Sequence, residues 1–168
     1  MWYVDSIGLV KTPRGVTIDG VQHPRNIFTL WSKADLAAIG IKPASITAVD
    51  SRYKNTGELT WDTSGAEAVG TYGTTDKVVA DLKKTMTESV QSYAASTLAG
   101  SDWYTIREAD GGTACPADWK TYRAAVRTES NSKVTAIAAL ADLDAIKAFD
   151  AATPITAGWP NDPDYVAP

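Results

Sequence analysis

One apolar stripe constrains the fold of this chain more than any other feature of its sequence. Its members recur at spacings of three and four residues, which is the period of one face of an α-helix. They are Val79, Leu82, Met86, Val90, Tyr93 and Thr97. Thr74 or Thr75 is a suitable N-terminal cap, and Gly100 is a suitable end. We therefore predict a long helix over residues 75–99, of about six turns.

The stripe is narrow, because threonine, serine, glutamine, lysine and aspartate cover the other faces of the predicted helix. A narrow stripe is typical of a helix that packs on another helix or on a partner chain. We expect this helix to pack within its own chain. Self-association through residues 75–99 is the alternative, in which a second copy of the chain covers the stripe.

The residues before this helix favour short strands joined by turns. Residues 2–4 are typical of a strand, and Asp19-Gly20 between β-type residues predicts a hairpin. A second hairpin is predicted from residues 46–53 and 58–62, with the turn-rich tetrad KNTG between them. The first part of the chain is therefore expected to be rich in β-structure.

A short helix is predicted between these two hairpins, over residues 33–39. Ser32 is a good N-terminal cap, and Asp35 three residues later completes a weaker form of the capping box. Gly40 stands where a C-terminal cap belongs. The apolar side of this helix is expected to face the cluster around Trp31.

Residues 102–127 repeat an aromatic and basic pattern on both sides of a Gly-Gly turn. Two Asp-Trp pairs are each followed by a tyrosine and then by an arginine. Residues 103–106 are expected to be a helix end or a strand, and Pro116 fits the first position of a new helix. The apolar stripe of that helix comprises Trp119, Tyr122 and Val126.

The C-terminal end of the chain has a helical segment followed by a tail without periodicity. A shorter helix is predicted over residues 143–149. The Pro-rich segment after it is expected to be extended, and ordered only where Trp159 and Tyr165 dock on another surface.

Together these elements predict an α+β fold. A small β-rich N-terminal module is followed by a long helix and a helical C-terminal unit with an extended tail. We place the module at residues 1–64, a glycine-bearing linker at 65–73, the helical domain at 74–152 and the tail at 153–168.

Charge and composition exclude several classes of function. The net charge is −4, from 16 basic and 20 acidic residues, which argues against a protein that binds the phosphate backbone of nucleic acids. No stretch approaches the roughly 20 apolar residues that span a bilayer. The N-terminus lacks the basic start and long apolar run of a signal peptide, so we expect a protein without a membrane partner.

Catalytic and metal-binding chemistry has no positive support in the sequence. His23 is the single histidine and Cys115 the single cysteine, so neither a metal site nor a nucleophile with a nearby base is indicated. His23 is interpreted as a turn or surface residue and Cys115 as a small residue packed at a helix start. We expect no enzyme activity, no catalytic residue, no metal and no cofactor.

A longer motif runs through residues 102–127. A D-W-Y-x-x-R segment leads through a short acidic-glycine turn to a Pro-started helix with Y-R-x-x-x-R. Its residues are Asp102, Trp103, Tyr104, Arg107, Gly112, Pro116, Tyr122, Arg123 and Arg127. This pattern resembles the C-terminal region of the tail fibre assembly proteins, or tail fibre chaperones, of tailed bacteriophages. The phrase GVQHPRNIFTLWSKADLAAIGI is similar to a recurring opening in such proteins, whereas residues 75–99 match no motif of the family.

The resemblance implies a protein that binds a trimeric phage tail fibre. It would act as an assembly chaperone in the host cytoplasm, or stay in the virion tail as a fibre-associated subunit. Aromatic and arginine side chains are favoured in interface cores. We expect the partner-binding residues to be Trp103, Tyr104, Arg107, Tyr122, Arg123, Arg127, Trp159 and Tyr165.

Several alternatives stay open at this point. The protein could bind other tail subunits, as a tail or baseplate adaptor without chaperone action. Six tryptophans and seven tyrosines also fit a carbohydrate-binding module. The rings of Trp103 and Trp119 could instead pack on the helix over residues 75–99 and form a local core.

Overall fold

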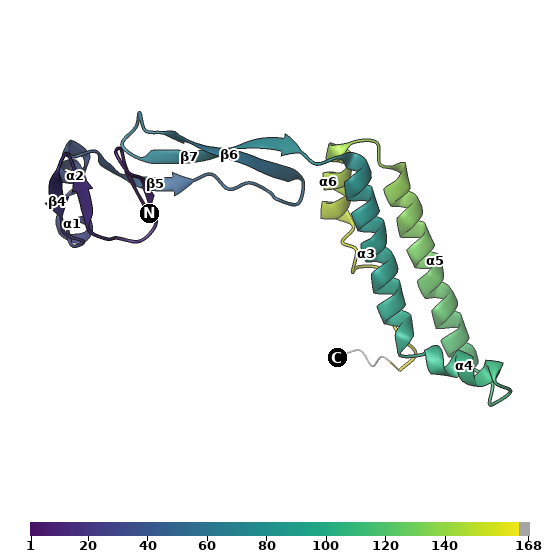
Figure 1. Ribbon diagram of the computed structural model, residues 1–168. Coiled ribbons are helices and arrows are strands. Elements are labelled where there is room, and N and C mark those ends of the chain that lie inside the picture. Colours follow the sequence, from purple (N-terminus) through teal and green to yellow (C-terminus); the bar gives the residue numbers. More distant parts are fainter. Residues whose placement is uncertain (165–168) are drawn as a thin grey trace. The chain divides into compact units, whose positions relative to one another are not determined.

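The computed structural model describes residues 1–164 of this 168-residue chain. The chain divides into two compact units, Met1–Asp76 and Lys77–Pro168. The first unit holds all the strands, and the described elements of the second unit are helices (Figure 1). The fold class is therefore α+β, as predicted from the sequence.

A mixed five-stranded sheet forms the frame of the first unit, in the order β2-β1-β5-β7-β6. Its strands are β1 (Trp2–Val4), β2 (Gly8–Val10), β5 (Ile41–Ile46), β6 (Lys54–Asp62) and β7 (Ala68–Asp76). β5 and β7 are parallel, and all other neighbours in the sheet are antiparallel. The predicted strand over residues 2–4 is confirmed.

The hairpin predicted around Asp19-Gly20 is confirmed. β3 (Val16–Ile18) pairs antiparallel with β4 (Val21–His23) through this two-residue turn. Asp19 has φ of 49° and Gly20 has φ of 80°, so both lie in the left-handed region. Two-residue hairpins favour such a turn because its twist matches that of the flanking strands, and Asp-Gly adopts it at low cost.

Two short helices follow the hairpin. α1 (Ile27–Leu30) precedes α2 (Lys33–Ala38), which begins with the predicted capping box. The Oγ of Ser32 accepts from the Asp35 N–H at 3.1 Å, and the Asp35 carboxylate accepts from the Ser32 N–H at 3.3 Å. Gly40 follows with φ of 75°, which is the left-handed conformation that ends a helix.

The core of the first unit lies where the hairpin and the two helices cover β1, β2 and β5. Aliphatic side chains dominate it, with one aromatic ring. Its buried members are Val4, Val10, Val16, Ile18, Ile27, Phe28, Leu36 and Ile41. Burial of these side chains stabilises the unit at about 25 cal/mol for each Å² of apolar surface removed from water.

The prediction of a second hairpin with its turn at KNTG is wrong. Lys54 to Gly57 lie inside β6, which pairs antiparallel with β7 across residues 63–67. The Asp62 carboxylate accepts from both the N–H and the Oγ–H of Ser64, which closes that turn. Pairing along β7 therefore overrides the local turn preference of the tetrad.

The prediction of a linker over residues 65–73 is also wrong, because β7 occupies most of that range. Gly70 lets the Trp61 ring lie close to the backbone of β7 and does not act as a flexible hinge. A Cβ built there would lie 3.0 Å from the ring of Trp61. The division between the units lies after Asp76 instead. The predicted caps Thr74 and Thr75 pair with β6, so the long helix begins only at Val79.

The second unit consists of four described helices. They are α3 (Val79–Ala99), α4 (Asp102–Ala109), α5 (Ala117–Ala139) and α6 (Leu143–Ala152). Pro116 stands at the N-cap of α5, one residue before the predicted position. The prediction of a helix end or strand at residues 103–106 is wrong, because these residues lie inside a separate helix, α4.

α3 packs within its own chain, as predicted, and Val90 of its apolar stripe is fully buried. α3 lies beside α5 and also contacts α6 (Figure 1). Ala94 of α3 meets Tyr122 and Val126 of α5 in a buried cluster, and Trp119 packs against its edge. Lys83 of α3 donates to the carbonyls of Ala138 and Leu140, which satisfies carbonyl groups at the end of α5.

The described part of the tail, residues 153–164, forms no helix or strand. It docks on the helices through Trp159, whose ring lies 5.1 Å from that of Tyr93. Within residues 1–164, none of the helices has the length and apolar character that crossing a membrane requires.

Candidate partner-binding surface

The most exposed aromatic-basic surface of the second unit lies on α4. Trp103 is 50% exposed and Ile106 is 59% exposed. Arg107 follows Trp103 by four residues, and its guanidinium carbon lies 4.7 Å from the centre of the Trp103 ring. Residues three and four apart share one face of a helix, so these side chains form one surface. We call Trp103, Ile106 and Arg107 the α4 face.

A row of aromatic rings leads from the α4 face into the core. The rings of Trp103 and Tyr104 are stacked with centres 3.9 Å apart, and Tyr104 lies 5.4 Å from Trp119 of α5. Trp119 in turn meets Tyr122 edge-on at 5.6 Å. Aromatic pairs at such distances contribute about 0.5–1.5 kcal/mol each beyond their burial. The exposed Trp103 is thus held in place by rings that are progressively more buried.

Arg107 also fixes the loop that joins α4 to α5. Its Nε–H donates to the carbonyl of Thr113 at 3.0 Å. Gly112 donates from its N–H to the Arg107 carbonyl at 2.9 Å, and a Cβ on Gly112 would lie 2.9 Å from Arg107. The glycine of the motif is therefore needed for the close approach of the loop to Arg107.

A second link between α4 and α5 is an ion pair. The Lys120 ammonium donates to the Glu108 carboxylate at 2.6 Å, and the backbone N–H of Cys115 donates to the same carboxylate at 3.4 Å. The hydrogen bond from Lys120 is the main cause that lowers the pKa of Glu108. Cys115 is itself buried, as expected for a small residue packed at the start of a helix.

Arg123 does not lie on the surface, although it was expected to meet another chain. It is only 6% exposed and donates to the Leu98 carbonyl at 3.0 Å and the Ser101 Oγ at 2.6 Å. It also forms an ion pair with Asp102 at 2.7 Å. These contacts join the end of α3 and the start of α4 to α5. Arg123 is stable inside because each of these three acceptors receives a hydrogen bond from its guanidinium.

The other predicted residues divide between surface and interior. Arg127 is exposed, and its side chain makes no hydrogen bond or ion pair within residues 1–164. Tyr122 is 8% exposed and belongs to the core. Trp159 is half-buried, and its Nε1–H donates to the Ile155 carbonyl at 2.6 Å. Tyr165 lies outside the described residues.

Some surface residues were missed by the sequence reasoning. Ile106 belongs to the α4 face, but the ambiguity between helix and strand at residues 103–106 hid its relation to Trp103. In the first unit, Leu30 and Trp31 are exposed at the end of α1. His23, at the end of β4, is half-buried and lies edge-on to the Trp31 ring at 5.7 Å.

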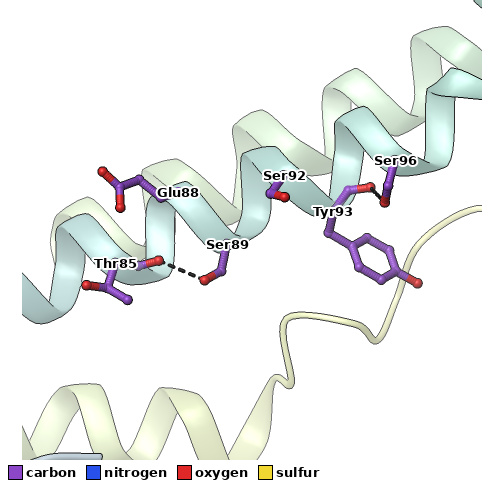
Figure 2. Close-up of a pocket in the computed structure, with 6 residues that line it drawn as sticks. All are labelled: Thr85, Glu88, Ser89, Ser92, Tyr93 and Ser96. Atoms are coloured by element: carbon purple, nitrogen blue, oxygen red, sulfur yellow. Dashed lines mark hydrogen bonds between the residues drawn. The ribbon is translucent and has the colours of Figure 1, made fainter.

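The outer side of α3 carries a shallow groove lined by hydroxyl groups (Figure 2). Ser89 donates to the Thr85 carbonyl at 2.8 Å, and Ser96 donates to the Tyr93 carbonyl at 2.8 Å. These hydroxyls are thus bonded back to their own helix. Tyr93 instead projects away from α3, toward the segment that follows α6 (Figure 2).

No group of histidine, cysteine, aspartate and glutamate side chains in residues 1–164 is arranged to hold a metal ion. The α4 face contains no nucleophile with a base beside it. It instead presents groups suited to binding another molecule: an indole ring, an aliphatic side chain and a guanidinium on one helix.

Comparisons with known proteins identify no relative of this chain. No protein-family model, no curated protein and no solved structure matches it.

Proposed function

We propose that this chain binds the tail fibre of a tailed bacteriophage, either as an assembly chaperone or as a subunit that stays on the fibre. The observation that carries the proposal is the α4 face, where Trp103, Ile106 and Arg107 are presented together. Tryptophan and arginine dominate the binding energy of many interfaces. The sequence motif that resembles fibre assembly proteins includes Trp103 and Arg107.

The surroundings of the α4 face support a binding role. Trp103 is stacked on Tyr104, and Arg107 is fixed by its bond to Thr113. A surface whose side chains are already ordered loses little conformational entropy when a partner binds. The buried Arg123 holds the first residue of α4 through its ion pair with Asp102, which gives this motif residue a supporting part in the interface.

Two settings follow from the proposal. A chaperone acts in the host cytoplasm, where it covers apolar surface of fibre chains before they assemble. A retained subunit is carried on the fibre into the virion tail. Mass spectrometry of purified virions separates the two, because only the retained subunit is recovered in stoichiometric amounts.

The test is co-expression with a candidate tail fibre chain, followed by measurement of the affinity of the complex. Trp103→Ala combined with Ile106→Ser is expected to weaken binding roughly tenfold or more, since losing a hot-spot residue costs about 2 kcal/mol. Val78→Ser is the matched control, because Val78 is also an exposed apolar residue of the second unit but lies before α3.

Equal binding by the double variant and the control would remove the α4 face from the interface. Fibre trimers that form and stay soluble without the protein would contradict the chaperone form of the proposal. That result, together with recovery from virions, would instead favour a tail or baseplate adaptor.

A further inference from the structure

A second site candidate lies in the second unit, away from the α4 face. An open pocket of about 290 Å³ is lined by residues of α3, α5 and the segment that follows α6. Its lining is predominantly polar, and Tyr93, Tyr122 and Trp159 stand around it. Its size is close to the lower end of small-molecule sites, about 300 Å³.

The wall contributed by the tail segment is built by buried contacts. Lys133 is 5% exposed and donates from Nζ to the Ala157 carbonyl at 2.8 Å. The same ammonium lies 5.8 Å from the centre of the Trp159 ring and 3.2 Å from the Glu129 carboxylate. Lys133 thereby fixes the segment on which Trp159 and Asp162 lie, so the pocket is held by the fold itself.

Tyr122 brings a hydroxyl group from the core to this pocket. Its side chain is more than nine-tenths buried, yet none of the hydrogen bonds within residues 1–164 involves its hydroxyl. Burial raises the pKa of Tyr122, and the neighbouring Asp162 and Tyr93 raise it further. Tyr122, Tyr93 and Asp162 all line the pocket, so the Tyr122 hydroxyl is available to a ligand bound there.

The charges around the pocket exclude anionic ligands. Asp162 is the one charged residue of the lining, and the nearby Lys133 is already paired. The aromatic rings do not form an open cage for a cation, because Tyr93 packs on Trp159 and Tyr122 packs on Trp119. Cation recognition by aromatic side chains requires free ring faces.

The remaining groups match a neutral ligand with many hydroxyls. Thr97, Thr156 and the two tyrosines offer hydroxyls that both donate and accept, Asn161 offers an amide, and Asp162 accepts. We propose that this pocket binds a neutral monosaccharide unit, held by the Tyr122 hydroxyl, Asn161 and Asp162. This activity goes beyond fibre binding and uses none of the residues of the α4 face.

The test is titration of the full chain with glucose, galactose, mannose, rhamnose and N-acetylglucosamine, followed by NMR of backbone amides and of the Trp159 indole N–H. At least one sugar is expected to bind with Kd of about 10 mM or tighter. The shifts should be confined to residues 156–162 and the facing parts of α3 and α5. No shift with any of these sugars would overturn the proposal.

Variants make the assignment specific to the pocket. Tyr122→Phe, which removes only the hydroxyl, is expected to weaken binding about fivefold. Thr156→Val, which removes a hydroxyl from the segment after α6, is also expected to weaken binding. Asp162→Asn should weaken sugar binding by about threefold, because the amide oxygen still accepts a hydrogen bond but the charge-assisted bond is lost. Asp164→Asn is the matched control two residues along the tail and should change nothing.

Two further outcomes would contradict the proposal. Unchanged affinity in both Tyr122→Phe and Thr156→Val would place the sugar elsewhere. Binding of choline that is lost in Asp162→Asn, with no sugar bound, would assign the pocket to a cation instead. Because these titrations use the protein alone, their failure leaves the fibre-binding proposal untouched.

Discussion

At the scale of single residues, Arg123 joins three segments of the second unit. Its guanidinium is buried and bonded to Leu98, Ser101 and Asp102, while its Nε lacks a partner in the described residues. A buried charge of this kind is stabilising only while its partners stay in place, because the desolvation cost of a charge is large.

Arg123→Ala is expected to destabilise the protein by about 2–4 kcal/mol, since it removes the guanidinium that donates to Ser101 Oγ and pairs with Asp102. Urea denaturation followed by circular dichroism measures this change. Arg127→Ala, one turn along the same helix but exposed, is the control and should stay within about 0.5 kcal/mol. Equal stabilities for the two variants would show that the contacts of Arg123 contribute nothing net.

Also at this scale, the pKa of Glu108 is lowered by Lys120, so their pair stabilises the folded state above the ordinary glutamate pKa of about 4.3. This contribution is lost as the pH falls through the lowered pKa of the folded state. Glu108→Gln should therefore melt below the wild type at pH 7, with the difference shrinking below about pH 4. Thermal melts across this range measure it, and a difference independent of pH would contradict the ion-pair explanation.

At the scale of elements, the pairing of β6 with β7 depends on a missing side chain. Gly70 lies opposite Trp61, whose ring also meets Tyr3 of β1 at 4.9 Å. A Cβ on Gly70 would lie 3.0 Å from that ring and 3.2 Å from Ile46. The indole can therefore cover this part of the sheet only because β7 has a glycine there.

Gly70→Val is expected to destabilise the first unit by about 1–3 kcal/mol through overpacking against Trp61. Gly73→Val in the same strand is the control, because a Cβ there would meet only the Glu58 carbonyl at an ordinary 3.7 Å. Chemical denaturation of both variants measures the difference. A Gly70 variant as stable as the control would mean that Trp61 can move aside at no cost.

At the scale of the whole molecule, each of the two units has a core of its own. The first unit buries aliphatic residues between its sheet, hairpin and short helices. The second buries Ala94, Tyr122 and Val126 between helices. A unit with its own core is expected to fold without the other.

Separate expression of residues 1–76 and 77–168 tests this expectation. The second fragment should keep a helical circular dichroism spectrum and melt cooperatively, and the first should show dispersed amide signals typical of a β-rich fold. If either fragment is unfolded while the full chain is folded, the two units are not independent in stability.

A feature of this fold could be predicted from the sequence when the residues that form it lie close together in the chain. The Asp19-Gly20 turn, the Ser32 and Asp35 capping box and the α3 stripe were predicted because their partners lie within a few residues. The aromatic motif of residues 102–127 is also local, and it predicted Trp103 and Arg107 of the α4 face but not Ile106. Local backbone preferences and helical periodicity can be recognised directly in the amino-acid sequence.

Only the tertiary structure decided the features whose partners are distant in the chain. It made residues 68–76 a strand because they pair with β5 and β6, and it buried Arg123 because acceptors from Leu98, Ser101 and Asp102 surround its guanidinium. It also placed Trp159 beside Tyr93, and both residues line the pocket proposed to bind a monosaccharide. The sequence by itself determined the local elements of this protein, whereas the packing of distant segments determined which aromatic and basic side chains stay exposed.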